Sequence, residues 1–148
     1  MIAVVQRVTS ASVTVQVPAH KESIGIGMCV LLGIETNDDD KEVAWMAKKL
    51  SALRIFPDED NKMNKSLIDV EGELLLISQF TLSGDCAHGN RPSFINAAKP
   101  ELAEPLVTKV GELLQKGYGI TVKNGVFGAK MNVAINNDGP VTIIVRRT

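Results

Sequence analysis

Alternating apolar and polar residues fill the first third of the chain, and this two-residue period constrains the fold more than any other feature. Successive side chains of a β-strand point to opposite faces, so Val13, Val15 and Val17 are expected on one face. An apolar run at 28–34 predicts a strand that is buried on both faces. The strands expected in this region are 2–9, 12–17, 23–27 and 28–34.

Two later segments have the spacing of amphipathic helices. The acidic cluster 37–40 supplies N-cap candidates for the first helix. The second is expected to end at Gly117, and to begin late or kink because of Pro100 and Pro105. The periodic apolar residues are Val43, Met46, Ala47, Leu50 and Leu53 in the first helix and Leu102, Leu106, Val110, Leu113 and Leu114 in the second.

The rest of the chain consists of short strand patterns separated by turn signals. A Gly-containing loop at 83–91 is closed by Pro92, and Ser93 is a candidate helix N-cap. Two helices among many strands, mostly joined by hairpins, predict an α+β fold. We expect one domain, 1–148, with a strongly curved, barrel-like, mostly antiparallel sheet packed against two helices. The further strands expected are 54–56, 73–80, 120–123, 126–136 and 141–146, with turns at 58–62, 71–72, 124–125 and 137–140.

Composition excludes several classes of protein. With 148 residues, 45% of them hydrophobic, the chain is long enough for one buried core and is not disordered. A formal net charge of −1 argues against nucleic-acid binding by bulk charge. No apolar run approaches the ~20 residues of a membrane helix, and no signal peptide is evident, so we expect a cytoplasmic protein without membrane contact. Two cysteines, Cys29 and Cys86, are too few for a disulfide framework.

The common catalytic motifs are absent, which removes support for nucleotide hydrolysis and zinc chemistry. The sequence has no phosphate-binding loop, no H-E-x-x-H and no C-x-x-C. The two histidines, His20 and His88, both lie in polar loops, and a Ser-His-Asp triad would need one of them. Cys86 and His88 are two residues apart, but two ligands do not make a zinc site, and both side chains also suit a solvated loop. We expect no metal and no cofactor.

Two segments carry more polar groups than a strand or a turn requires. In 78–82 an apolar strand ends in polar residues before a loop, and such an end can present N–H groups and hydroxyls to a substrate carbonyl. The same residues also suit a half-buried strand edge whose hydroxyls bond nearby backbone. In 137–142 a Gly-Pro pair suits an ordinary tight turn equally well.

Taken together, these two segments resemble motifs of one enzyme family. Ser78 to Leu82 resembles S-Q-x-x-L, and the segment 138–142 contains G-P-V-T, both found in the D-aminoacyl-tRNA deacylases, the D-tyrosyl-tRNA(Tyr) deacylase family. Departures from the family pattern lie at 18–23, at 87–90, which is usually more basic, and at Pro105. The resemblance extends over nearly the whole chain, with further matches at 5–8, 11–15, 53–56, 62–64, 84–86, 91–94 and 127–131.

The resemblance implies a homodimeric hydrolase that acts in the quality control of translation. Such an enzyme cleaves the ester between a D-amino acid and the terminal adenosine of tRNA and rejects L-aminoacyl-tRNA. Glycyl-tRNA, including glycine mischarged on tRNA(Ala), is expected to be cleaved as well, because glycine has no side chain for the site to exclude. An aminoacyl ester is already activated, so positioning and oxyanion stabilisation suffice without histidine.

The resemblance also assigns roles to individual residues near Thr81. Backbone N–H groups around Gln79, Phe80 and Thr81 are expected to hold the ester carbonyl, and Ser78 and Gln79 to orient this segment or the adenosine. Thr81 is the family's candidate nucleophile. A threonine hydroxyl without a base is a weak nucleophile, so we favour attack by water assisted by the ribose 2′-hydroxyl.

Chirality is assigned to Gly139 and Pro140, which the resemblance places in the cis form and inserts into the site of the partner subunit. A rigid wall that collides with an L side chain discriminates better than contacts common to both enantiomers. Arg7 resembles the residue that holds this segment in place. Phe127 and Met131 are the remaining residues expected to bind substrate.

A non-catalytic RNA-binding or dimerisation module on the same sheet is the alternative. It requires basic and aromatic residues together, whereas the aromatic residues are only Trp45, Tyr118 and four phenylalanines, none of them in a stacking motif. An enzyme releases amino acid from D-aminoacyl-tRNA without added metal or nucleotide. A binding module does not.

Overall fold

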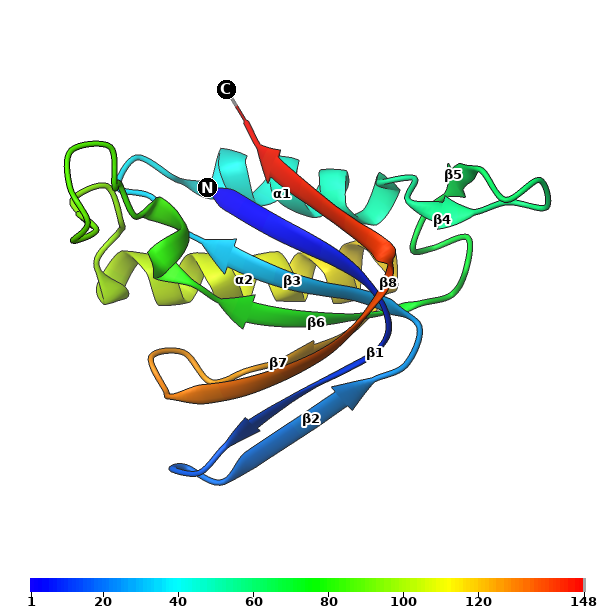
Figure 1. The fold of residues 1–148 in the computed structure, drawn as a ribbon, viewed down its shortest axis with the longest axis horizontal. Helices are drawn as coiled ribbons and strands as arrows, with labels where there is room; N and C mark the ends of the chain where they lie inside the picture. Colours follow the sequence, from blue (N-terminus) through cyan, green and yellow to red (C-terminus); the bar gives the residue numbers. More distant parts are fainter. Residues whose placement is uncertain (148) are drawn as a thin grey trace.

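The computed structural model describes residues 1–147, which form a strongly curved sheet with two helices on one face (Figure 1). The longest strands belong to the chain's two ends. The strands are β1 (Ile2–Val15), β2 (His20–Ile24), β3 (Gly27–Gly33), β4 (Phe56–Pro57), β5 (Met63–Lys65), β6 (Glu73–Ser78), β7 (Thr121–Asn124) and β8 (Met131–Arg146); the helices are α1 (Asp40–Ala52), the 3₁₀ helix η1 (Phe80–Ser83) and α2 (Pro100–Tyr118).

Strand β1 is the spine of the sheet. Its first half pairs with β3 and its second half with β2, while β8 runs antiparallel along the other side of both halves. The separate strands 2–9 and 12–17 were therefore a wrong prediction, because β1 is one strand from Ile2 to Val15 and pairs with β8 over that whole length. Val17 lies beyond the strand and is 85% exposed. Strand 23–27 was also misplaced, since β2 ends at Ile24 and Gly27 already belongs to β3.

The other half of the sheet is parallel. β6 pairs with β3 and β7 pairs with β6, and each of these connections carries a helix, as a parallel crossover requires. The predicted hairpin at 124–125 is wrong, because β7 pairs only with β6 and β8 begins six residues further on. In the segment 125–130, Val126 and Ala129 instead pack against the interior of the curved sheet, while Phe127 packs against the apolar cluster on the helix side.

The Gly-Pro segment is not a turn between two strands, as the sequence suggested, but part of β8. In the pairing of β1 with β8, Gln6 is opposite Thr142 and Val8 is opposite Asn137, so four residues of β8 bulge out beside Arg7. A bulge bends a strand without ending its pairing. Because β1 holds both halves of β8, the local turn composition does not break the strand.

The first helix is close to the predicted one. Asp39 is its N-cap: the Asp39 carboxylate accepts from the Lys41 N–H at 2.7 Å, and the Glu42 carboxylate accepts from the Asp39 N–H at 3.4 Å. These two bonds form a capping box. The bond from the Lys41 N–H is the largest cause that lowers the pKa of the Asp39 carboxyl group. Strand 54–56 was placed too early, since β4 consists of Phe56 and Pro57.

The second helix begins earlier than predicted and is continuous through Pro105. Pro100 occupies its first turn, where a missing N–H costs no hydrogen bond, and Lys99 is the N-cap. Ser93 is not an N-cap, because it exchanges two backbone hydrogen bonds with Asp85 instead. At the other end the helix extends to Tyr118, and Gly119 caps it with φ of 68°, a value that glycine adopts readily.

Two apolar clusters fill the molecule. The larger packs both helices against the convex face of the sheet, and the smaller fills the inside of its curl; the smaller consists of Val8, Ala11, Val13, Val15, Ile24, Cys29, Leu75 and Ile77. The predicted α+β class, with two helices against a barrel-like sheet, is confirmed. Over residues 1–147, neither helix has the length and apolarity needed to span a membrane.

Candidate active site

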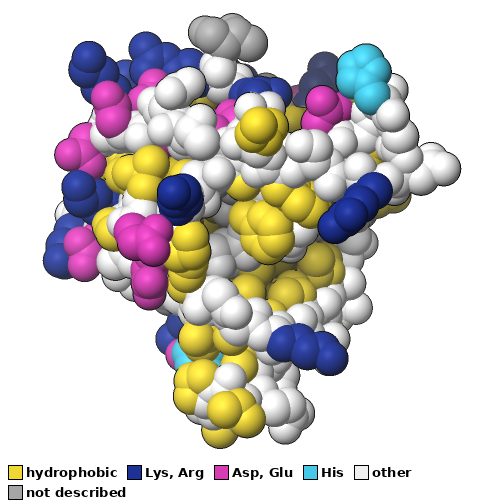
Figure 2. All heavy atoms as spheres, turned by 90° about the vertical axis from the view of Figure 1, so that its left-hand side faces the viewer, with side chains coloured by type: hydrophobic (Ala, Val, Ile, Leu, Met, Phe, Trp, Pro, Cys, Tyr) yellow, Lys and Arg dark blue, Asp and Glu magenta, His cyan; other side chains and the backbone are white. Residues whose placement is uncertain are grey.

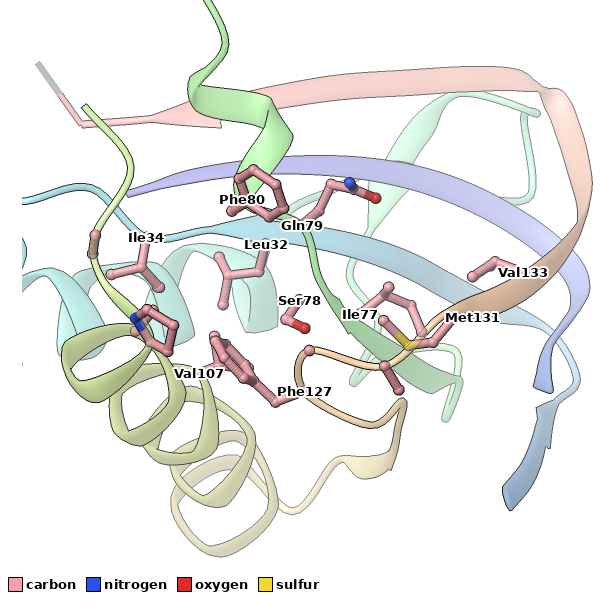
Figure 3. A pocket seen from close by; sticks show the side chains of 15 residues that line it. Leu32, Ile34, Ile77, Ser78, Gln79, Phe80, Val107, Phe127, Met131 and Val133 are labelled. Atoms are coloured by element: carbon pink, nitrogen blue, oxygen red, sulfur yellow. The ribbon is translucent and has the colours of Figure 1, made fainter. Parts of the chain in front are cut away.

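A cavity of about 500 Å³ opens at the end of β6, beside the N-terminus of α2. Figure 2 shows it as a hollow with an apolar floor and Lys or Arg side chains at several points around it. Figure 3 shows its labelled side chains converging from β3, β6, α2 and the segment that leads into β8. The cavity is lined by Leu32, Ile34, Ile77, Ser78, Gln79, Phe80, Ala98, Pro100, Ala103, Val107, Phe127, Gly128, Ala129, Met131 and Val133.

The chain changes conformation at the rim of this cavity. β6 ends at Ser78, so the predicted strand 73–80 is two residues too long, and η1 begins at Phe80. Gln79 lies between them with φ of −147° and ψ of 83°, and its N–H donates to the Leu32 carbonyl at 2.8 Å. The first N–H groups of a helix lack intrahelical acceptors. Among the described residues, the N–H groups of Phe80 and Thr81 donate to no backbone carbonyl.

The side chains of this segment are ordered by one another. The Gln79 amide Nε2 donates to the Thr81 hydroxyl. Ser78 is half-buried and lies between the rings of Phe80 and Phe127 (Figure 3). The Phe80 ring is 56% exposed and packs edge-to-face on Phe94, with ring centroids 5.1 Å apart. The segment therefore presents an amide, two hydroxyls and two free N–H groups at one mouth.

Phe127 and Met131 form the opposite rim. Phe127 faces Phe80 across the cavity, and Met131 stands at the start of β8 (Figure 3). Gly125 allows the Met131 side chain to approach this closely, because a Cβ at position 125 would lie 2.5 Å from the Met131 sulfur. Of the nine residues that the sequence singled out, five line the cavity: Ser78, Gln79, Phe80, Phe127 and Met131. Thr81 adjoins them through Gln79.

Arg7, Gly139 and Pro140 lie outside this cavity. The Arg7 Nε donates to the Asp138 carbonyl at 3.2 Å and pairs with the Asp138 carboxylate at 3.2 Å, while Nη1 donates to the Ile55 carbonyl at 2.7 Å. The peptide bond between Gly139 and Pro140 is cis. Gly139 has φ of 120°, and a Cβ there would lie 3.0 Å from Arg7 Nη2. Arg7 thus holds the segment that contains the cis peptide bond, and Pro140 in this segment is exposed.

Gln6 belongs to the same arrangement, and the sequence did not single it out as a site residue. Its side-chain oxygen accepts from the Asn137 amide at 3.0 Å and from the Thr142 hydroxyl at 2.6 Å. Gln6 and Arg7 together therefore hold both ends of the bulge in β8. The polar pair at 6–7, directly after the apolar run 2–5, was the available signal.

The cavity lining contains no histidine and no carboxylate within the described chain. His20 bonds the Asn124 carbonyl at 2.8 Å, and His88 lies in the exposed loop that also carries Cys86. Cys29 is buried in the smaller apolar cluster and does not line the cavity, and its burial raises the pKa of the thiol to about 11. It stays protonated at neutral pH. The site therefore offers hydrogen-bond donors rather than a base and an activated nucleophile.

Comparison with known proteins identifies relatives over nearly the whole chain. A family model described as D-Tyr-tRNA(Tyr) deacylase matches residues 4–146. D-aminoacyl-tRNA deacylases from Fervidobacterium nodosum and Chlorobaculum parvum are 51% and 49% identical, each over 145 residues, covering 98% of this chain and 96% and 97% of those proteins. A solved structure described as c-Myc DNA Unwinding Element Binding Protein superposes with a TM-score of 0.91 at 47% identity, covering 100% of this chain and 99% of that one.

Proposed function

Since this chain belongs to the D-Tyr-tRNA(Tyr) deacylase family, we propose that it hydrolyses the ester between a D-amino acid and the terminal adenosine of tRNA. The products are the free D-amino acid and tRNA. We take residues 1–148 as one deacylase domain that works in the cytoplasm as a proofreading enzyme of translation. The observation that carries the reaction is the pair of unpaired N–H groups at Phe80 and Thr81, at the rim of a cavity without a base.

These two N–H groups suit an oxyanion. Attack on the ester carbonyl places negative charge on its oxygen, and preorganised donors stabilise that charge most in the transition state. Backbone donors need no reorganisation, because the Gln79 N–H bond to Leu32 and the 3₁₀ turn fix their direction. Ser78 and Gln79 then orient the ester and the ribose.

Water is the proposed nucleophile. The Thr81 hydroxyl accepts a hydrogen bond from Gln79, and the cavity lining supplies no base to remove its proton. A water oxygen adds to the ester carbon and gives a proton to the ribose 2′-hydroxyl, which passes its own proton to the 3′-oxygen as the ester C–O bond breaks. Thr81 positions the segment through its bond with Gln79.

The apolar part of the cavity suits the terminal adenosine. Phe80 and Phe127 face each other across it, and Met131 closes one side (Figure 3). Purines stack on aromatic rings, and thioethers make favourable contacts with π-systems. We assign Phe127 and Met131 to the adenosine and Ser78 to Thr81 to the ester.

Chiral discrimination requires a second copy of the chain. Pro140 is exposed on the edge strand β8, which pairs only with β1 in the described residues, and it lies outside the cavity described above. We propose a homodimer in which Gly139 and Pro140 of one subunit form a wall against L side chains in the partner's site. Ile144 on the same strand is 72% exposed and suits such an interface. Glycine has no side chain to collide, so glycyl-tRNA is a substrate too.

The direct test is a deacylation assay with D- and L-tyrosyl-tRNA at equal concentrations, without added nucleotide. The expected result is release of D-tyrosine with the L ester left intact. A non-catalytic RNA-binding or dimerisation module would release tyrosine from neither of the two tRNA esters. Equal hydrolysis of both enantiomers would contradict the chiral function while leaving ester hydrolysis in place.

A further inference from the structure

Three large apolar side chains are exposed beside the cavity, and the proposed reaction does not use all of them. Phe80 is 56% exposed, Phe94 37% and Ile95 81%. Phe94 contacts Phe80 edge-to-face, and Ile95 follows it in the chain. We call Phe94 and Ile95, with the basic residues Arg91 and Lys99, the outer patch.

The outer patch is continuous with the cavity. Phe80 belongs to the cavity lining and touches Phe94. Ala98 and Pro100 also line the cavity, so Lys99 stands between two lining residues. A backbone bond from the Ala98 N–H to the Ile34 carbonyl at 2.9 Å holds this segment on the end of β3.

Charge separates this surface from the rest of the molecule. The segment 86–100 contains Arg91, Lys99 and His88 but no carboxylate, although the chain has 17 acidic residues. Arg91 and Lys99 form no ion pair with any residue in 1–147. Exposed cations without partners beside apolar side chains suit a ligand that combines phosphates with flat apolar rings.

We infer that the outer patch binds the unpaired nucleotides that precede the terminal adenosine of tRNA. This inference rests on the proposed function, which puts the adenosine in the adjoining cavity. An RNA strand that leaves the cavity past Phe80 brings its bases to Phe94 and Ile95. Its phosphates then lie near Arg91 and Lys99. Single-stranded RNA is bound by this combination of stacking and backbone neutralisation.

The test compares three D-tyrosyl esters: the full tRNA, the trinucleotide cytidylyl-cytidylyl-adenosine, and adenosine alone. The variant carries Arg91→Gln, Ile95→Ser and Lys99→Gln, and Lys99→Gln alone serves as a second, milder variant. Lys62→Gln is the control, because Lys62 lies in the turn between β4 and β5, at the opposite end of the molecule from the cavity in Figure 1. Thermal unfolding of each protein verifies that the changes leave the fold intact.

The triple variant is expected to lose about tenfold in kcat/KM on the tRNA and trinucleotide esters and nothing on the adenosine ester. Loss of two phosphate contacts makes the negative slope of log(kcat/KM) against log[salt] shallower by about 1.4. Unchanged rates on all three esters, an equal loss on all three, or a shift in sedimentation coefficient that marks the patch as a subunit contact would each overturn the assignment. If the wild-type protein cleaved none of the esters, the proposed function would fail, and the inference with it.

Discussion

The segments 78–83 and 138–142 both interrupt the regular course of a β-strand, but they differ in what they face. The first leaves β6 at the rim of a cavity, and its donors are fixed by bonds to neighbouring backbone. The second bulges from an exposed edge strand, is held by Gln6 and Arg7, and lies outside the cavity of its own chain. The first segment and the cavity that it faces belong to the same chain. The second segment is rigid but faces no part of that cavity. This difference is the reason for the proposed division of labour, in which chemistry and chiral discrimination reside in different subunits.

Removing one backbone donor tests the first segment and has the largest expected effect. Phe80→Pro deletes the Phe80 N–H at the first position of η1, where Gln79, with ψ of 83°, lies outside the α region that a following proline disfavours. Loss of one oxyanion donor is expected to lower kcat by about 10²–10³-fold. The measurement is single-turnover deacylation of D-tyrosyl-tRNA.

Phe80→Ala is the matched control, because it removes the ring and keeps the N–H. The decrease in kcat of Phe80→Ala measures the contribution of the ring alone. The ratio of kcat between the two variants measures the contribution of the N–H donor. Equal rates for Phe80→Pro and Phe80→Ala would show that this N–H does not stabilise the transition state.

A mixed dimer tests the second segment. Pro140→Ala replaces the pyrrolidine ring by a methyl group, and discrimination against L-tyrosyl-tRNA is expected to fall by roughly 10–200-fold, the range for a small change in a pocket wall. A dimer of one Pro140→Ala chain and one Phe80→Pro chain, isolated with two affinity tags, has one intact cavity facing one intact wall. It should reject the L ester and cleave the D ester at about half the wild-type rate, since one of two equivalent sites works.

Wild-type dimers that carry both tags supply the reference for this experiment. If the mixed dimer cleaved the L ester as readily as the Pro140→Ala homodimer does, the wall would act within its own chain. That result would contradict the proposal that catalysis and chiral discrimination come from different subunits.

Glycine probes the wall without any change to the protein. Glycyl-tRNA offers the same ammonium and ester groups as alanyl-tRNA, and the absence of a methyl group costs about 1–3 kcal/mol of binding, or 10–200-fold. Its rate is therefore expected to fall between those of the D- and L-alanyl esters in parallel assays. If glycine resisted cleavage as strongly as L-alanine, the site would recognise a D side chain instead of excluding an L one.

The Thr81 hydroxyl is expected to give the smallest effect. Thr81→Ser keeps a hydroxyl in reach of the Gln79 amide and should change kcat by less than about threefold, because a single neutral hydrogen bond is worth about 0.5–1.5 kcal/mol and here is retained. Mass spectrometry of rapidly quenched reactions should find no acyl group on the protein. An acyl-Thr81 adduct would make Thr81 the nucleophile and contradict attack by water.

The parts of the fold that local sequence dictates were predictable. Asp39 and Glu42 form the capping box at the start of α1, and apolar spacing marks the buried face of that helix. The bulge at 138–141 was mistaken for a turn because its composition is that of a turn. What keeps β8 continuous is its pairing with β1, more than a hundred residues away, which no local pattern contains.

In the site, too, features set by local sequence were predictable and features set by distant parts of the chain were not. The segment 78–81 stands out by its polar residues after an apolar strand, and the structure places three of its four residues on the cavity. The contribution of α2 to the lining, through Pro100 and Val107, was not visible, because an apolar helix position predicts burial but not a cavity. Gln6 was missed for a related reason, since its partners come from the other end of the chain.

The pairing of β1 with β8 also has a consequence for synthesis on the ribosome. Ile2 is opposite Arg146, so the first strand to leave the ribosome waits for the last one to complete its sheet. At ~5–20 residues per second, this delay is roughly 7–30 s. During that time one edge of β1 has unpaired N–H and C=O groups over its whole length, and such an edge is a template for pairing with another nascent chain. Depletion of chaperones should therefore lower the yield of folded protein, because the unpaired edge of β1 is then free to pair with other nascent chains.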